Sequence, residues 1–216
     1  MGTIEALSLA MGTAWTSGIN LYATVAALGI ANRMEMIHLP QNLEVLSHPG
    51  VIAIACVMYV IEFFADKVPY VDTGWDALHT FIRVPAGAIL AAQSLGDLNP
   101  ALELMALLAG GSVSLVAHGT KAAARLAINA SPEPFSNWFA SVTEDVTVFG
   151  SIWLMFNHPI IMLIFVLTFL AVVAWLVPKI YRLAKSGFQA LRDKMRGAKP
   201  DQPAPSGPSA QPTSPN

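Results

Sequence analysis

The chain has little charge and a single cysteine, and both shortages limit what it can be. Asp, Glu, Lys and Arg make up 12% of its 216 residues, whereas a soluble domain carries about 25%. The lone Cys56 cannot form a disulfide within the chain. Glycine-rich phosphate loops, a serine nucleophile elbow, paired CxxC motifs and HExxH are also absent. The sequence therefore gives no support to the enzyme classes that those motifs mark.

Apolar residues are abundant instead, at 54% of the chain, and the mean hydropathy is +0.54. The run IIMLIFVLTFLAVVAWLV, at residues 160–177, contains no charged residue. Eighteen such residues in a helix cross most of a hydrocarbon core about 30 Å thick. A helix of a soluble protein is rarely apolar on every face over this length. The composition therefore predicts an integral membrane protein.

Short polar or proline-containing connections divide the chain into apolar segments, which predicts an all-α, polytopic transmembrane helix bundle. We expect about six segments, at residues 6–31, 49–65, 73–95, 101–128, 137–156 and 160–181. The first is uncharged but rich in small and polar residues between Gly12 and Asn20. Such residues permit close helix packing, and they mark places where a membrane helix is broken or re-entrant.

The basic residues predict the domain organisation and the topology. Seven of the twelve Lys and Arg lie from Lys179 onward, whereas residues 1–178 hold five basic and twelve acidic residues, a balance of −7. We expect a transmembrane domain at 1–182, a basic amphipathic juxtamembrane helix at 183–197 and a disordered tail at 198–216. Basic residues beside a span stay in the cytoplasm. Six spans then place both termini there, with a bacterial inner membrane as the default location. The basic segment suits an anionic bilayer surface rather than nucleic acid. The sequence is compatible with a homo-oligomer.

Charged residues recur at helical spacing inside the apolar part. They form the set of candidate site residues Glu62, Asp66, Asp72, Asp76, His79, Arg83, His118, Lys121, Arg125, Glu144 and Asp145. Spacings of three and four residues place the charged side chains within 62–66, within 72–83 and within 118–125 on one helix face each. A charge at the bilayer centre costs roughly 2.5–3.5 kcal/mol even on the mildest scales. These side chains must therefore face a partner, a water-filled cavity or the membrane surface.

The charged side chains within 62–66 and 72–83 are mainly acidic, and those within 118–125 are basic. We therefore expect the acids and the bases to pair. Asp72 or Asp76 with Lys121 or Arg125 are the expected contacts. The alternative for any single residue is a structural ion pair that fixes helix register. Asp66 is expected to be a solvated loop residue. Asp72, Asp76 and His79 also form a candidate face for Mg, Mn or Fe, so a divalent cation is the one cofactor candidate.

Four motifs carry a family resemblance. They are SGINLY (17–22), EFFADKVPYVDTGWDALHTFIRVPAGA (62–88), HGTKAAARLAINASPEP (118–134) and SNWFASVTED (136–145). Together they resemble the bacterial and plastid membrane proteins grouped as domain-of-unknown-function family 4126. The likeness extends over about residues 5–181. It implies a multi-pass membrane protein and no assigned activity.

Three functions fit these observations, and whether the protein is an enzyme stays open. The first is a transporter or channel for a small solute or cation, with the charged residues holding charge or relaying protons. The second is a membrane-embedded enzyme in which Arg83, Lys121 and Arg125 clamp a phospholipid headgroup. No DGxxAR run of a lipid phosphotransferase is present to support it. The third is a non-catalytic membrane assembly factor.

Overall fold

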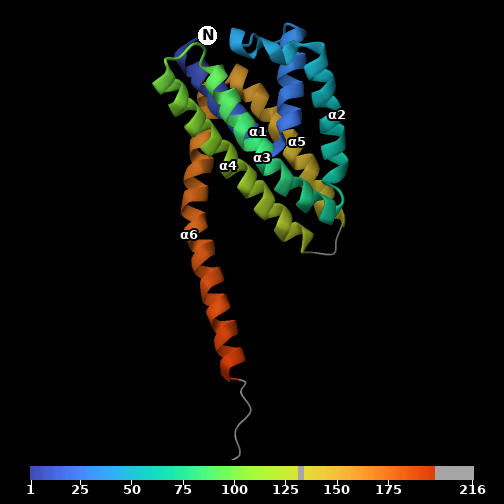
Figure 1. The fold of residues 1–216 in the computed structure, drawn as a ribbon, viewed down its shortest axis with the longest axis vertical. Helices are drawn as coiled ribbons and strands as arrows, with labels where there is room; N and C mark the ends of the chain where they lie inside the picture. The colour runs from blue at the N-terminus through green and yellow to red at the C-terminus, as the bar shows by residue number, and fades with distance from the viewer. Residues whose placement is uncertain (131–133, 198–216) are drawn as a thin grey trace, which may run out of the picture. The chain divides into compact units, whose positions relative to one another are not determined.

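The computed structural model describes residues 1–130 and 134–197, and the regular structure in these residues is entirely helical, which confirms the all-α prediction. Its elements are α1 (Thr3–Arg33), the 3₁₀ helix η1 (Gln41–Ser47), α2 (Pro49–Ala65), α3 (Pro69–Ser94), α4 (Pro100–Asn129), α5 (Pro134–Asn157) and α6 (Pro159–Gly197). The chain divides into two compact units, Met1–Ala174 and Trp175–Asn216. Figure 1 shows the elements.

Each α-helix after α1 begins at a proline. The first residues are Pro49, Pro69, Pro100, Pro134 and Pro159. Proline suits this position because the first helical N–H has no partner within the helix and the ring fixes a helical φ. Two of these starts are also capped by a side chain. His48 accepts from the Gly50 N–H, and Asn99 accepts from the next two backbone N–H groups. The sequence predicted these starts to within four residues.

Helix α1 is broken at Asn20 and folds back. Asn20 has extended backbone angles, φ −146° and ψ 97°, between two helical halves. A straight helix of this length would hold its ends about 45 Å apart. Instead, Glu5 and Leu9 from the first half line one cavity with His38, which follows the second half. Figure 1 shows both ends of α1 at the same end of the first unit, so α1 is not a single straight rod.

Side chains at the break stabilise both half-helices. The Asn20 Oδ1 accepts from the Ala23 N–H at 2.9 Å, which makes Asn20 the N-cap of the second half. The Ile19 carbonyl, at the end of the first half, accepts from Lys121 Nζ at 3.2 Å. A cation is favourable there because the carboxyl end of a helix carries partial negative charge. The break is therefore a capped structural feature that brings backbone polar groups into the interior.

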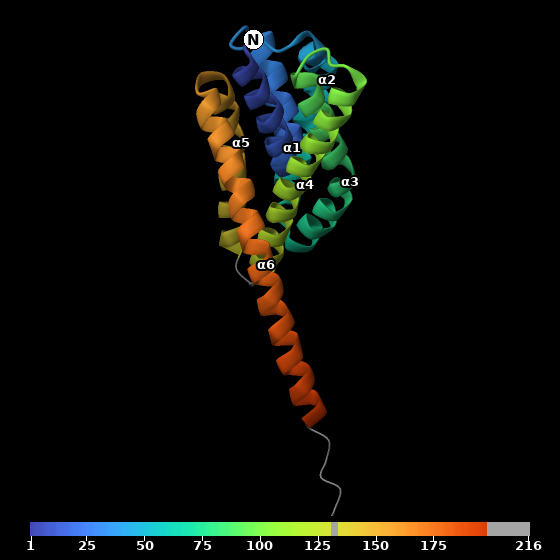
Figure 2. The ribbon, with the colours of Figure 1, turned by 90° about the vertical axis from the view of Figure 1, so that its left-hand side faces the viewer.

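Small residues let α1, α3 and α4 pack closely around this break. A Cβ on Gly18 of α1 would meet the Ser114 carbonyl and the Ala117 side chain of α4. A Cβ on Gly87 of α3 would meet the Ser114 side chain at 2.5 Å. Such contacts are typical of helices that associate within a membrane. Figure 2 shows α1, α3 and α4 adjacent in the first unit.

The first unit buries charged side chains beside its hydrophobic core and exposes large apolar ones. Arg83, Glu62 and Asp72 are completely buried, while Phe81, Phe139 and Leu104 are more than half exposed. Large exposed apolar surfaces mark contact with lipid or with another protein. By length and composition, and within the described residues, α4, α5 and α6 are able to cross a membrane, and a fourth span results if η1 and α2, bent by 64°, count as one. These helices indicate a membrane protein. The count of three or four spans among the described residues is lower than the six that the sequence predicted.

The second unit contains the end of α6, which is helical through Gly197. Its basic side chains that the structure describes are exposed, and Lys179 Nζ lies 3.2 Å from the centre of the Trp175 ring. The predicted juxtamembrane segment 183–197 is thus helical, and its contact with a bilayer stays a prediction. The predicted tail, 198–216, lies outside the described residues.

Candidate functional site

The eleven candidate residues converge inside the first unit. They come from the end of α2 and the turn after it, the first half of α3, the second half of α4 and the middle of α5. Nine of them are at most 6% exposed, and Glu144 and Asp145 are half-buried. We call these eleven residues the ionic cluster. Asp66 belongs to it with 2% exposure, so the expectation of a solvated loop residue is wrong. The chain turns inward there because Lys121 and Arg125 both contact its carboxylate.

Arg83 joins α2, α3 and α4. Its NH2 lies 2.6 Å from Glu62 Oε1, and its NH1 lies 3.1 Å from Asp76 Oδ1 and 3.2 Å from His118 Nδ1. Arg83 and Glu62 are both 0% exposed. Such short pairs are strong charge-assisted hydrogen bonds, and they compensate the cost of burying each charge.

Lys121 lies at the centre of the cluster. Its Nζ is within 4 Å of the carboxylates of Glu62, Asp66, Asp76 and Glu144, the nearest being Glu144 Oε2 at 3.2 Å. The same ammonium donates to the Ile19 carbonyl at the break in α1. Lys121 therefore connects the acids of three helices to the end of a half-helix.

Arg125 uses all five of its N–H donors. Its Nε and NH2 donate to the two oxygens of Glu144, both at 2.8 Å. NH2 also donates to Asp66 Oδ2. NH1 donates to the backbone carbonyls of Asp66 and Asn137. A guanidinium with no remaining donor cannot bind a further anion without losing one of these partners.

The hydrogen-bond partners of His118 assign it a neutral state, and those of His79 place a proton on its Nδ1. His118 Nδ1 faces the Arg83 guanidinium and so accepts, while its Nε2 lies 2.8 Å from Thr80 Oγ1 and 3.1 Å from the Asp76 carbonyl. His79 Nδ1 lies 2.8 Å from the Trp75 carbonyl, to which it donates, and its Nε2 faces the Tyr22 hydroxyl at 3.1 Å. A carbonyl accepts only, which fixes these tautomers.

Acceptors exceed donors in the cluster. It contains six acids against the three bases Arg83, Lys121 and Arg125. Among the described residues, the buried oxygens Glu62 Oε2, Asp66 Oδ1 and Asp76 Oδ2 have no hydrogen-bond partner. Asp72 Oδ1 has none either, with Arg125 Nε at 3.9 Å. A buried acceptor without a partner is costly, so these oxygens favour the arrival of a proton or a cation.

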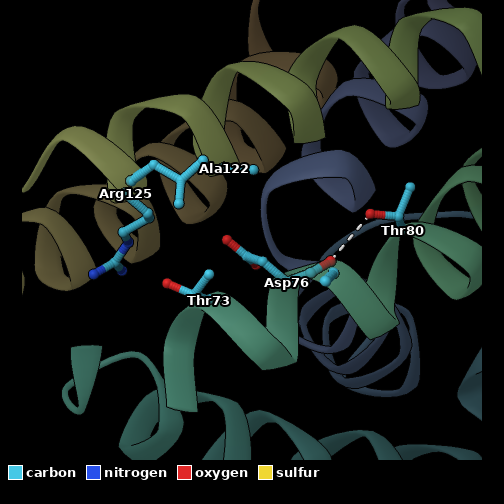
Figure 3. Close-up of a pocket in the computed structure, with 7 residues that line it drawn as sticks. Thr73, Asp76, Thr80, Ala122 and Arg125 are labelled. Atoms are coloured by element: carbon cyan, nitrogen blue, oxygen red, sulfur yellow. Dashed lines mark hydrogen bonds between the residues drawn. The ribbon is translucent and has the colours of Figure 1, made fainter. Parts of the chain in front are cut away.

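A cavity of about 150 Å³ reaches the cluster between α3 and α4. Figure 3 shows Asp76 and Arg125 beside it, with Thr73 and Thr80 of α3 and Ala122 of α4. The rest of its wall is apolar, and Ala77 lies at the exposed rim. The cavity thus connects the surface of the unit to the carboxylate of Asp76.

The predicted metal face receives no support. Asp72 accepts from Asn129 at 2.8 Å, Asp76 pairs with Arg83, and His79 contacts Tyr22. The three side chains thus have separate partners. Within residues 1–130 and 134–197, no group of three or more His, Cys, Asp or Glu side chains is placed to hold a metal ion.

Sequence reasoning missed four participants: the Ile19 carbonyl, Asn20, Tyr22 and Asn129. Asn20 Nδ2 lies 3.4 Å from Asp145 Oδ1, and Asn129 Nδ2 donates to Asp72. The signal for Asn20 and Tyr22 was their place in the motif SGINLY within an otherwise apolar segment. A carbonyl has no signal of its own in a sequence, because its availability depends on where the helix breaks.

A family model described as "Domain of unknown function (DUF4126)" matches residues 7–179. This range contains the entire ionic cluster and the break in α1. The match confirms the resemblance that the four motifs indicated. No curated protein and no solved structure matches the chain.

Proposed function

The chain belongs to the DUF4126 family, whose description assigns no activity, and we propose that it is a membrane transporter or channel for a small cation, with the ionic cluster as the binding site. The observation that carries the proposal is the excess of buried acceptors over donors. Six acids face three bases, and four carboxylate oxygens have no hydrogen-bond partner among the described residues. Such a site gains from a cation or a proton.

The break in α1 supports the same function. Transporters use broken helices to present backbone carbonyls and helix ends to their substrates at mid-membrane depth. Here the Ile19 carbonyl and the Asn20 amide contact Lys121 and Asp145 of the cluster. A substrate that displaces Lys121 would therefore also reach the end of a half-helix.

Binding of a phospholipid phosphate has less support. Every donor of Arg125 is occupied, and Lys121 is surrounded by four carboxylates. An incoming phosphate would meet a net negative site, which repels it. A non-catalytic assembly role is the outcome if no transport is found, because a structural ion-pair network requires none.

Loss of transport in a Glu62→Gln variant tests the proposal. Glu62 is 0% exposed, and its removal leaves enough acids to pair every base. We expect proteoliposomes to carry a cation current in a panel of H⁺, Na⁺, K⁺ and methylammonium gradients. The variant should lower that current about tenfold or more, equivalent to a barrier increase of about 1.4 kcal/mol. The matched control is Glu103→Gln, an exposed acid on α4, which should leave the current unchanged. No current from any cation, or equal currents in both variants, contradicts the proposal.

We further propose that the two termini lie on opposite sides of the membrane. α1 returns to its starting end, while α2 to α5 run in alternating directions between the ends of the first unit (Figure 1). Adding α6 gives five crossings, an odd number, in place of the six predicted. This count includes α3 because of its course through the unit in Figure 1, whereas length and composition alone mark only α4, α5, α6 and the η1–α2 pair among the described residues. The basic residues after Lys179 favour a cytoplasmic C-terminus. Short epitope tags at each end, probed with protease in sealed inverted vesicles, should show only the C-terminal tag digested. Digestion of both tags, or of neither, would place both termini on one side and contradict the five-crossing topology.

A further inference from the structure

The cavity between α3 and α4 ends at the carboxylate of Asp76, of which only one oxygen has a polar partner among the described residues. Asp76 is 3% exposed. Its Oδ1 lies 3.1 Å from Arg83 NH1 and 3.8 Å from Lys121 Nζ. Its Oδ2 is buried and has no hydrogen-bond partner among the described residues, yet Asp76 lines the cavity. Figure 3 shows the Asp76 side chain beside the cavity, and its unpartnered Oδ2 is the acceptor that a ligand bound there would use.

The other polar groups of the cavity exclude an anionic ligand. Arg125 forms part of the wall, but its five donors are all engaged with Glu144, Asp66 and Asn137. Thr80 shares its hydroxyl with His118 and the Asp76 carbonyl. The cavity therefore presents acceptor capacity to a ligand and little donor capacity.

The size and the apolar lining exclude a bare inorganic ion. A dehydrated divalent cation needs about six or more oxygen ligands, and the cavity offers one carboxylate oxygen and two threonine hydroxyls. Its volume of about 150 Å³ is larger than such an ion needs, and Ala77, Ala122 and Leu126 form much of its wall. A ligand with a cationic end and a short apolar body matches both parts, because the apolar body gains by leaving water.

We infer that this cavity binds a primary ammonium group carried on a short apolar chain, with Asp76 Oδ2 as its carboxylate acceptor. The inference rests on the proposed function, of which it names the cation class. Two sources carry this chemistry: a free alkylamine and the ethanolamine headgroup of a phospholipid. The rim residues Thr73, Ala77 and Leu126 are exposed on the outer surface of the unit, so either source can reach the cavity.

Calorimetric titration of the full chain in detergent with n-propylammonium chloride tests the inference. We expect saturable binding, with 1-propanol and propionate failing to bind because they lack the ammonium group. Asp76→Asn should weaken binding about tenfold or more, equivalent to about 1.4 kcal/mol. Equal binding of 1-propanol, or unchanged binding in Asp76→Asn, would overturn the inference.

A steric pair keeps the test independent of the ion pairs. Ala122→Leu fills the cavity from α4 without altering a charge, and it should abolish propylammonium binding. Ala123→Leu places the same side chain at the next position on α4, which is exposed and outside the cavity lining, and it should bind as the wild type does. Equal binding by the two variants would show that the ammonium binds elsewhere and would reject the site.

A second arm identifies the source. In nanodiscs of phosphatidylcholine, propylammonium should still bind. If phosphatidylethanolamine at equal lipid content suppresses this binding, the headgroup is the occupant, and if it has no effect, the free amine is. A cation current in proteoliposomes without propylammonium binding rejects only the inference. Propylammonium binding with no cation current in the panel rejects only the proposed function.

Discussion

Replacing Arg83 with methionine is expected to lower the free energy of unfolding by about 3–5 kcal/mol, the loss typical when one member of a buried ion pair is removed. Methionine fills similar space but leaves Glu62 and Asp76 without their guanidinium partner. Both acids are nearly or fully buried, and Glu62 lies 2.6 Å from Arg83 NH2. His118 Nδ1 also loses the donor it accepts from. Among the described residues, Lys121 would then be the only base within 4 Å of Glu62 and Asp76.

Unfolding by guanidinium chloride in mild detergent, followed by tryptophan fluorescence, measures this loss of stability. Arg182→Met is the matched control, because Arg182 is exposed on α6, and a change within about 0.5 kcal/mol is expected there. The double variant Arg83→Met with Glu62→Gln should recover part of the stability, since it removes one of the stranded charges. If Arg83→Met is as stable as Arg182→Met, the guanidinium is not needed to compensate the two acids.

Lys121→Met should destabilise the fold by a similar amount and make its stability rise more steeply on acidification than that of the wild type. Four carboxylates lie within 4 Å of Lys121 Nζ. Without the ammonium they repel one another, so the folded variant binds protons more readily than the unfolded chain does. Stability rises as pH falls whenever the folded state binds more protons. We expect the midpoint of thermal unfolding of the variant to increase between about pH 8 and about pH 5.

The same pH series on the wild type and on Lys185→Met provides the comparison. Lys185 is exposed on α6, and its loss should leave the wild-type pH response in place. A Lys121→Met protein whose unfolding midpoint responds to pH no more strongly than that of Lys185→Met would show that the carboxylates do not depend on this ammonium. Such a result would also remove the basis for a displaceable lysine in the proposed transport site.

The sequence predicted the composition of the ionic cluster because burial in a membrane leaves charges few alternatives. Spacings of three and four put Asp72, Asp76 and Arg83 on one face of α3, and Lys121 and Arg125 on one face of α4. The predicted pairing of these acids and bases is present, with Lys121 3.8 Å from Asp76 and Arg125 3.9 Å from Asp72. The cost of a charge facing lipid made this outcome predictable without a structure.

The fate of individual acids was less predictable. Asp66 follows the last residue of α2, where a loop residue in water and an inward-facing ligand of Lys121 look alike in sequence. Asp72, Asp76 and His79 share the spacing of a metal site, yet each has a different partner. Which base binds a given acid depends on how α4 lies against α3, and this is a tertiary property.

By itself, the sequence determined that the protein is helical and apolar, where its helices start, and which charges must be hidden. These properties follow from local preferences and from the energy of placing each residue in lipid. The small and polar residues between Gly12 and Asn20 predicted a break in the first segment, and only the tertiary structure decided that it falls at Asn20 and turns α1 back. The contact of the Ile19 carbonyl with Lys121, and the unpartnered oxygens of the acids beside a cavity, were likewise decided by the tertiary structure. Those features depend on packing between residues far apart in the chain, which no local pattern encodes.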